Sequence, residues 1–236
     1  MQVSFSTKSI YGLGRLGSDP DSVLDRNVYG ITLDAESFYS RNALEGYGVT
    51  AFDAGGARER CRKLLRDCAS HGVSISAMRM PCLRWDTKRT DLREVLLRIG
   101  TEGIDACAGA GCGNLVIQPL FSGIPRALLW QENHRYYAAL GRKARQAGVR
   151  ILLENQCGHV NGHFVRGVCA DAAVAAEWID ALNEELEAEV FGFCLDTQAC
   201  SLCRQDMGEM AAYLGEKVKA VLVRECDGVH ESCRLP

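Results

Sequence analysis

Beyond its N-terminal quarter, the chain alternates segments of helical hydrophobic pattern with short apolar runs. The segment GARERCRKLLRDCASHGV places Leu64, Leu65 and Cys68 on one face of a helix, and Gly72 is a typical residue just after a helix end. The next residues, VSISAM at 73–78, fit a strand. Helices that alternate with strands in this way are typical of βα units, so the pattern predicts a parallel sheet.

Four more βα units follow the same pattern. Thr90, followed by Asp91 and Glu94, is expected to cap the first of their helices. The four helical patterns lead into apolar runs at residues 115–119, 150–155, 191–196 and 219–225. Before them, VSFST, YGITLD and GVTAFD fit strands, and DAESFYSRNALEGYG fits a helix. Seven or eight parallel strands favour a (β/α)8 TIM barrel, although an open doubly wound sheet has the same periodicity.

Length and composition fit one ordinary globular domain. A chain of 236 residues can bury one large core, and 47% hydrophobic with 24% charged residues is usual for such a domain. We therefore expect a single TIM-barrel domain over residues 1–236. No window approaches the eighteen or so consecutive apolar residues of a membrane helix, and the first residues, MQVSFSTKSIYGLG, do not resemble a signal peptide. These features predict a cytoplasmic protein with no membrane partner.

Charge and cysteine content narrow the class of partner. The net charge of -3 and the pI near 6.0 argue against a nucleic-acid-binding protein, which usually presents a basic face. A small molecule is the expected partner. The twelve cysteines are scattered through the expected helices and strands, which favours reduced thiols packed in the core. Cys200 and Cys203 form a CxxC pair without a second pair at zinc spacing, and a redox pair is the alternative.

Two of the expected strands end in a carboxylate. RILLEN carries Glu154 and FGFCLD carries Asp196. Because the strand ends of a barrel meet at one mouth, the two side chains are expected to converge. Buried carboxylates are costly unless a cation compensates them, and with histidine they can hold manganese, magnesium or zinc. The alternative is that each carboxylate caps the helix that follows it.

The Gly-rich segment between residues 155 and 170 is expected to be a loop at a strand end, where barrel enzymes carry their chemistry. It holds His159 and His163 four residues apart, for which loop polarity is the simpler interpretation. Trp85 and Trp130 follow two expected strands. They could stack on the face of a sugar, or they could pack beneath loops.

The strands GVRILLEN, GFCLDTQA and VKAVLVRECDGVHESCRLP, each with its following turn, resemble the xylose isomerase-like TIM barrels, the sugar phosphate isomerase/epimerase superfamily. The likeness covers roughly residues 48–236, where the order, spacing and ends of three successive strands agree. It implies a divalent metal held by a glutamate after strand five, an aspartate after strand six, a histidine on strand seven and a glutamate after strand eight. Glu154 and Asp196 match the first two of these positions.

Other positions depart from the family pattern. Ala199 stands where relatives commonly carry a histidine after the strand-six aspartate, and Leu222 stands at the strand-seven histidine. Gln118, before Pro119, replaces a histidine that relatives often show on strand four. In relatives the turn ending in CRLP precedes an eighth βα unit, so the barrel is expected to be incomplete at its C-terminal strand. An open barrel would expose strands one and seven and favour a homo-oligomer.

Three explanations of these departures stay open. In the first, the sequence is part of a longer product that supplies the last glutamate. In the second, the site has become a metal-free pocket. In the third, substitute ligands complete the metal site, with His159, His163, Glu225 and Asp227 as the candidates.

The resemblance implies a metal-dependent isomerase or epimerase that acts on a sugar or related polyhydroxylated carbonyl compound through an enediolate. Glu154 would be a metal ligand and a base, and Asp196 a second metal ligand. Gln118, Asn155 and His159 would face the hydroxyls of the substrate. The alternative is a catalytically silent barrel that binds a sugar or serves as an assembly subunit, which the departures at Ala199 and Leu222 favour. An abasic-site endonuclease, related by fold, would need metal-binding histidines and a basic groove that the sequence lacks.

Overall fold

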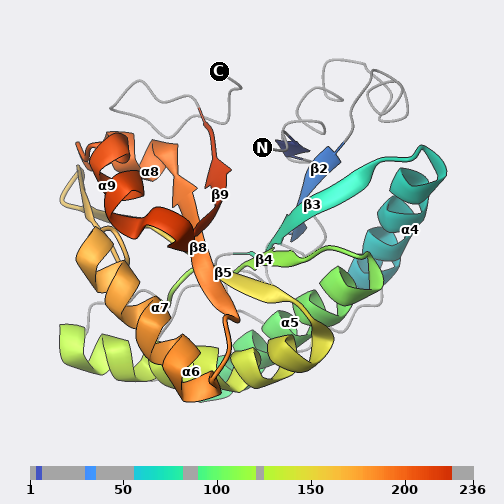
Figure 1. The fold of residues 1–236 in the computed structure, drawn as a ribbon, viewed down its shortest axis with the longest axis horizontal. Coiled ribbons are helices and arrows are strands. Elements are labelled where there is room, and N and C mark those ends of the chain that lie inside the picture. Colours follow the sequence, from blue (N-terminus) through green and yellow to red (C-terminus); the bar gives the residue numbers. More distant parts are fainter. Residues whose placement is uncertain (1–3, 7–29, 36–55, 82–89, 121–124, 225–236) are drawn as a thin grey trace. The chain divides into compact units, whose positions relative to one another are not determined.

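The computed structural model describes residues 4–6, 30–35, 56–81, 90–120 and 125–224 (Figure 1). The chain divides into two compact units, the first made of residues 1–115 with 147–149 and the second of residues 116–146 with 150–236. Both units consist of strands and helices in alternation, which confirms the expected α/β class. The expectation of one domain over the whole chain stays a prediction.

The first unit is a run of strands with helices between them. Its described elements are β1 (Phe5–Ser6), β2 (Gly30–Asp34), α4 (Gly56–Ser70), β3 (Ser74–Arg79), α5 (Thr90–Gly109) and β4 (Asn114–Val116), whose last residue belongs to the second unit. The strands follow the order β1-β2-β3-β4, and β2 pairs in parallel with both β1 and β3. The expected strands VSFST, YGITLD and VSISAM are thereby confirmed.

The predicted inner face of α4 packs on the strands of the first unit. Cys68 forms a buried cluster with Ile31 of β2 and with Val73, and Leu64 packs against that cluster. The helix ends as expected, because Gly72 adopts a φ of +68°, which residues with a side chain rarely adopt. The hydrophobic stripe read from the sequence therefore does place this helix on its sheet.

The second unit is built around three parallel strands. Its described elements are α6 (Arg126–Ala147), β5 (Arg150–Glu154), β6 (Cys157–Val160), β7 (His163–Arg166), α7 (Ala172–Leu186), β8 (Phe191–Asp196), α8 (Thr197–Leu202), α9 (Met207–Leu214), the 3-10 helix η3 (Gly215–Lys217) and β9 (Val218–Leu222). β8 pairs in parallel with β5 on one side and with β9 on the other. Figure 1 shows β8 between β5 and β9.

β5 and β8 are apolar along nearly their whole length because both of their faces are covered. All residues of β8 are buried, and so are all but the first of β5. α6 approaches β8 closely at Gly141, where an added Cβ would lie 2.7 Å from a ring carbon of Phe191. The Tyr137 hydroxyl of the same helix donates a hydrogen bond of 2.9 Å to the carbonyl of Ile117.

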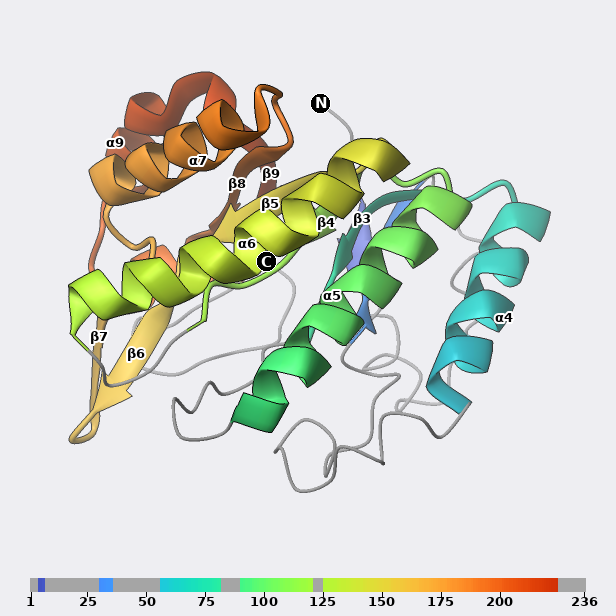
Figure 2. The same cartoon turned by 90° about the horizontal axis from the view of Figure 1, so that it is seen from below.

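The segment from 155 to 170, expected to be a loop, contains an antiparallel hairpin of β6 and β7. Figure 2 shows it as a separate two-stranded ribbon. Its turn is Asn161-Gly162, and both residues have positive φ, at +49° and +81°. Such a pair of positive φ angles is what a two-residue hairpin turn of type I′ requires, and Asn-Gly is its preferred sequence. The loop prediction was wrong, because Asn161-Gly162 forms a tight turn that pairs the residues on either side of it as strands.

Other differences concern the bounds of elements. The prediction missed the short helix α8, which begins directly after β8. β9 ends at Leu222, before the expected end of that strand at residue 225. The expected strand GVTAFD and nearly all of the expected helix DAESFYSRNALEGYG lie outside the described residues. None of the described helices is both long enough and apolar enough to cross a membrane.

Candidate functional site

The candidate site of the second unit is a polar layer at the C-terminal ends of its strands. Directly beneath it lies an apolar layer, in which Val116, Leu152 and Cys194 are buried together and Ala220 and Leu222 pack against them. Side chains two residues apart on a strand point to the same face. The residues that continue this face toward the C-terminal ends of the strands therefore lie two positions after Val116, Leu152, Cys194 and Leu222.

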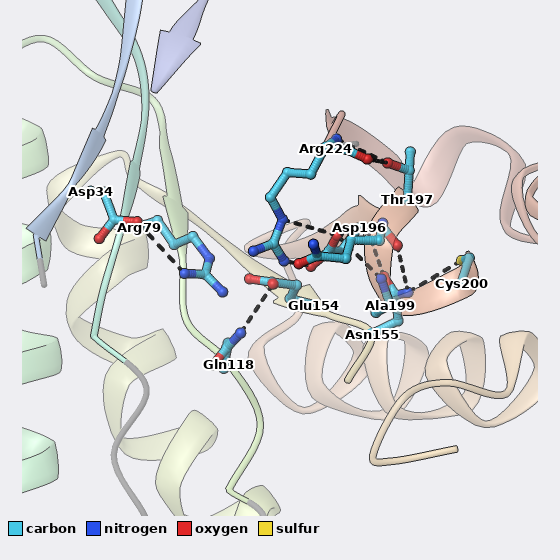
Figure 3. A network of polar contacts seen from close by, with 11 residues as sticks. Asp34, Arg79, Gln118, Glu154, Asn155, Asp196, Thr197, Ala199, Cys200 and Arg224 are labelled. Carbon is cyan, nitrogen blue, oxygen red and sulfur yellow. Dashed lines mark hydrogen bonds and ion pairs between the residues drawn. The ribbon is translucent and has the colours of Figure 1, made fainter. Parts of the chain in front are cut away.

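The polar layer consists of the residues reached by that step, namely Gln118, Glu154, Asp196 and Arg224. The strand register places these residues on one face. The partner of Glu154 is Cys194, two residues before Asp196, and the partner of Asp196 is Leu222, two residues before Arg224. Figure 3 shows the four side chains extending from the strand ends. The structure thus places Glu154 and Asp196 on the same face of neighbouring strands, as the barrel argument expected.

Glu154 is a completely buried carboxylate, with 0% of its surface exposed. Its Oε1 accepts a hydrogen bond of 3.0 Å from Nε2 of Gln118. The second polar atom of that amide, Gln118 Oε1, is buried and has no hydrogen-bond partner in the described part of the chain. No helix begins at Glu154, because the hairpin follows it, so helix capping does not account for this carboxylate.

Asp196 is buried as well and serves as the N-cap of α8. Its Oδ1 accepts hydrogen bonds from the backbone N–H of Gln198 at 2.9 Å and of Ala199 at 3.4 Å. The capping alternative is therefore confirmed for this residue. Ala199, at the position where relatives commonly carry a histidine, contributes its backbone N–H to the cap.

The carboxylate of Asp196 also forms an ion pair with Arg224. The Nε of Arg224 donates to Oδ1 at 3.3 Å, and its terminal nitrogen Nη2 contacts Oδ2 (Figure 3). The main chain of Arg224 is fixed too, since its N–H donates to Thr197 Oγ1 at 3.1 Å and its carbonyl accepts from that hydroxyl at 3.3 Å. Sequence reasoning missed Arg224, because nothing in the sequence around it distinguishes it from an ordinary solvent-exposed arginine.

Asn155 fastens the end of β5 to the end of β8. Its Oδ1 accepts from the backbone N–H of Asp196 at 2.7 Å, and its Nδ2 donates to the carbonyl of Asp196 at 3.0 Å. Nδ2 also donates to the Sγ of Cys200 at 3.3 Å. The structure therefore gives the Asn155 amide a positioning role, and the substrate contact expected of it stays a prediction.

The two histidines of the hairpin do not converge. His159 of β6 pairs with Phe164 of β7, their rings 5.3 Å apart, while His163 pairs with Val160. Successive residues of a strand point to opposite faces, so the two imidazoles lie on opposite faces of the ribbon. Both are exposed. They do not form a pair of ligands for one ion, and the role of His159 in substrate binding stays a prediction.

Other candidates are placed as follows. Trp130 of α6 packs on Trp178 of α7, with ring centroids 4.6 Å apart. The structure thus gives Trp130 a packing role within the protein. Trp85, Glu225 and Asp227 lie outside the described residues.

The CxxC pair does not resemble a redox site. Burial, and after it the negative charge of Asp196, raises the pKa of Cys200 to about 11. Burial also raises the pKa of Cys203. A catalytic CxxC instead has a lowered thiol pKa, usually at the start of a helix, whereas Cys200 lies well inside α8. Over the described ranges, no group of three or more His, Cys, Asp or Glu side chains is placed to hold a metal ion.

The sequence matches the model of the xylose isomerase-like TIM barrels over residues 42–234. No curated protein matches it significantly. A solved D-tagatose 3-epimerase-like protein is 13% identical with a TM-score of 0.67, over 98% of this chain and 78% of that one. A D-psicose 3-epimerase from Clostridium cellulolyticum H10 is 11% identical with a TM-score of 0.55, over 86% and 67%. An AP endonuclease of family 2 from Brucella melitensis is 10% identical with a TM-score of 0.59, over 87% and 73%. These likenesses confirm the expected TIM-barrel fold.

Proposed function

Because the chain belongs to the xylose isomerase-like TIM barrel family, we propose that it is an isomerase or epimerase acting on a sugar or a related polyhydroxylated carbonyl compound. Structural neighbours whose names are those of sugar epimerases support this class of substrate. The observation that carries the proposal is the buried carboxylate of Glu154, held by Gln118 at the edge where barrel enzymes perform their chemistry.

In the proposed mechanism, Glu154 is the general base. Its carboxylate takes the proton from the carbon next to the substrate carbonyl, and the electrons of the C–H bond form the C=C bond of an enediolate. The π electrons of the carbonyl move onto its oxygen. The carboxylic acid then returns the proton to the former carbonyl carbon, and the proton of the adjacent hydroxyl passes to the first oxygen as the new carbonyl forms, which completes an isomerisation.

Substrate hydroxyls would be bound by polar atoms of the same edge. Gln118 Oε1 and Gln156 Oε1 are both buried acceptors without a hydrogen-bond partner in the described segments. Buried acceptors of this kind are normally satisfied, so they are suited to accept hydrogen bonds from a bound polyol. Since Gln118 Nε2 holds Glu154, the same side chain would link the substrate to the base.

The divalent metal that the resemblance implies at Glu154 and Asp196 stays a prediction, and the contacts of Asp196 do not fit it. Oδ1 of Asp196 accepts from two backbone N–H groups and from Arg224, and Oδ2 contacts the same guanidinium. A divalent cation at this carboxylate would have to displace a side chain that is already positive. The proposed proton transfer therefore uses only side chains of the chain itself.

Glu154→Gln tests the proposal, because it keeps the size and removes the base. The assay is deuterium wash-in from D2O at the carbon next to the carbonyl, followed by NMR over a panel of aldoses and ketoses. We expect wash-in to fall by about 10²–10⁴-fold, the usual contribution of a general base. Gln118→Ala is the comparison variant, which should mainly raise KM. Unchanged wash-in in Glu154→Gln would rule out the mechanism.

The second candidate is a catalytically silent barrel that binds a sugar. The ion pair between Asp196 and Arg224 favours it, because the carboxylate is already neutralised within the protein. In that case the wild-type chain would show no wash-in with any sugar of the panel, while calorimetry would detect binding. Binding that persists in Glu154→Gln would support this candidate.

A further inference from the structure

The polar layer of the second unit contains a permanent cation that the chain supplies itself. Arg224 lies two residues beyond Leu222, the partner of Asp196 in the register of β8 and β9. Its guanidinium therefore extends over the same face as the carboxylate of Asp196. About 28% of the Arg224 side chain is exposed, against 2% for Asp196, so the cation lies between the buried carboxylate and the solvent.

We propose that the Arg224 guanidinium takes the place of a divalent metal at Asp196 and that this site works without one. A guanidinium stays protonated under all ordinary conditions, and its planar fork matches the two oxygens of a carboxylate. Both carboxylate oxygens of Asp196 contact it. A metal ion at the same oxygens would meet like charge at close range, so the two cations exclude each other.

The contact between Arg224 and Asp196 is reinforced because the main chain of Arg224 is also held in place. Thr197, the first residue of α8, bonds both the N–H and the carbonyl of Arg224. Asp196, one residue earlier, binds the guanidinium and caps the same helix. The helix start and the strand end are therefore joined through both the backbone and the side chain of one arginine.

Leu222 supports the same conclusion independently. At this position the family resemblance implies a metal-binding histidine, but the leucine packs on the apolar layer of Val116, Leu152 and Cys194. An aliphatic side chain offers no ligand atom. β9 therefore ends at a residue without a ligand atom, Leu222, and the chain supplies a cation two residues further on, at Arg224.

Manganese titration of the full chain, stripped with EDTA and desalted, tests the proposal. Free Mn²⁺ is measured by electron paramagnetic resonance for the wild type, Arg224→Gln and Arg224→Lys. We expect Arg224→Gln to bind Mn²⁺ at least tenfold more tightly than the wild type, since a carboxylate is released. Arg224→Lys keeps the positive charge and should resemble the wild type. Adding Asp196→Asn to Arg224→Gln should abolish the gain.

Equal Mn²⁺ affinity in the wild type and Arg224→Gln would overturn the proposal. Circular dichroism establishes that each variant is folded. If Arg224→Gln does not fold, the wild type and Asp196→Asn decide: one Mn²⁺ per wild-type chain, lost in Asp196→Asn, would overturn the proposal, and no specific binding by the wild type would support it. Since cation binding is measured without turnover, the result does not depend on the reaction proposed for Glu154.

Discussion

The amide of Asn155 offers the sharpest test of how the site is held. In Asn155→Ala, the N–H and the carbonyl of Asp196 both lose a buried partner, at 2.7 and 3.0 Å. The carbonyl of Asp196 still accepts the first hydrogen bond of α8, whereas its N–H is left without the bond to Asn155, so the free energy of unfolding should fall by about 1–3 kcal/mol. Because whole domains are stable by only about 5–15 kcal/mol, this is a large fraction of the total.

Asn183→Ala is a matched control at the other end of the same strand. The Oδ1 of Asn183 accepts from the N–H groups of Val190 and Phe191, at 2.9 and 2.8 Å, and its Nδ2 donates to the carbonyl of Phe191 at 3.0 Å. This variant should lose a similar amount of stability. It should leave the polar layer intact, because β8 separates Phe191 from Asp196 by its full length.

Urea denaturation measures the stability of both variants, and the labelling rate of Cys200 by iodoacetamide separates their local effects. Cys200 is buried against Asn155, so removing this side chain should expose the thiol and speed up its labelling at least tenfold under native conditions. Asn183→Ala should label Cys200 at the wild-type rate. A wild-type urea midpoint in Asn155→Ala, or equally fast labelling in both variants, would refute the reasoning.

Two further predictions concern packing and pH. Gly141→Ala would place a methyl group 2.7 Å from both Leu186 and Phe191, so urea denaturation should show a loss of about 1–3 kcal/mol. Gly109→Ala meets no atom within 4 Å and should show no loss. Burial and Asp196 raise the pKa of Cys200 from 9.0 to about 11, so the folded state holds this proton more tightly than the unfolded state. The resulting stability of about 2–3 kcal/mol should be present below pH 9 and lost as the pH rises to 11, with a flatter profile in Cys200→Ala.

The parallel strands could be predicted because a strand buried on both faces is apolar at successive positions of the sequence. Continuous apolar runs such as ILL before Glu154 and FCL before Asp196 arise where both faces of a strand are covered. The ends of these two runs mark Glu154 and Asp196 as members of the polar layer, and the family resemblance indicates a third member, Gln118. The hairpin around Asn161-Gly162 also had a local signal in its turn residues, which was overlooked in favour of the glycine content of the segment.

The ion pair of Arg224 was harder to predict because it depends on register. An arginine after an apolar strand is ordinarily a solvent-exposed residue, and nothing local distinguishes this one. The ion pair can be inferred only from the pairing of Leu222 in β9 with Asp196 in β8, because that pairing places Arg224 beside the carboxylate. The bonds of Asn155 are of the same kind, because they join residues 41 positions apart in the sequence.

The two layers of the second unit have a consequence for how such a protein can change. Along each strand only two residues, or about 7 Å, separate the side chains that stabilise the fold from those that would meet a ligand. Substitutions at Gln118 or Arg224 could alter the chemistry of the mouth while Val116 and Leu222 keep the strands together. Asp196 is the exception, because it caps α8 and binds Arg224 at once. A substitution of Asp196 would therefore need compensating substitutions elsewhere. We expect this position to tolerate fewer changes during evolution than Gln118 or Arg224.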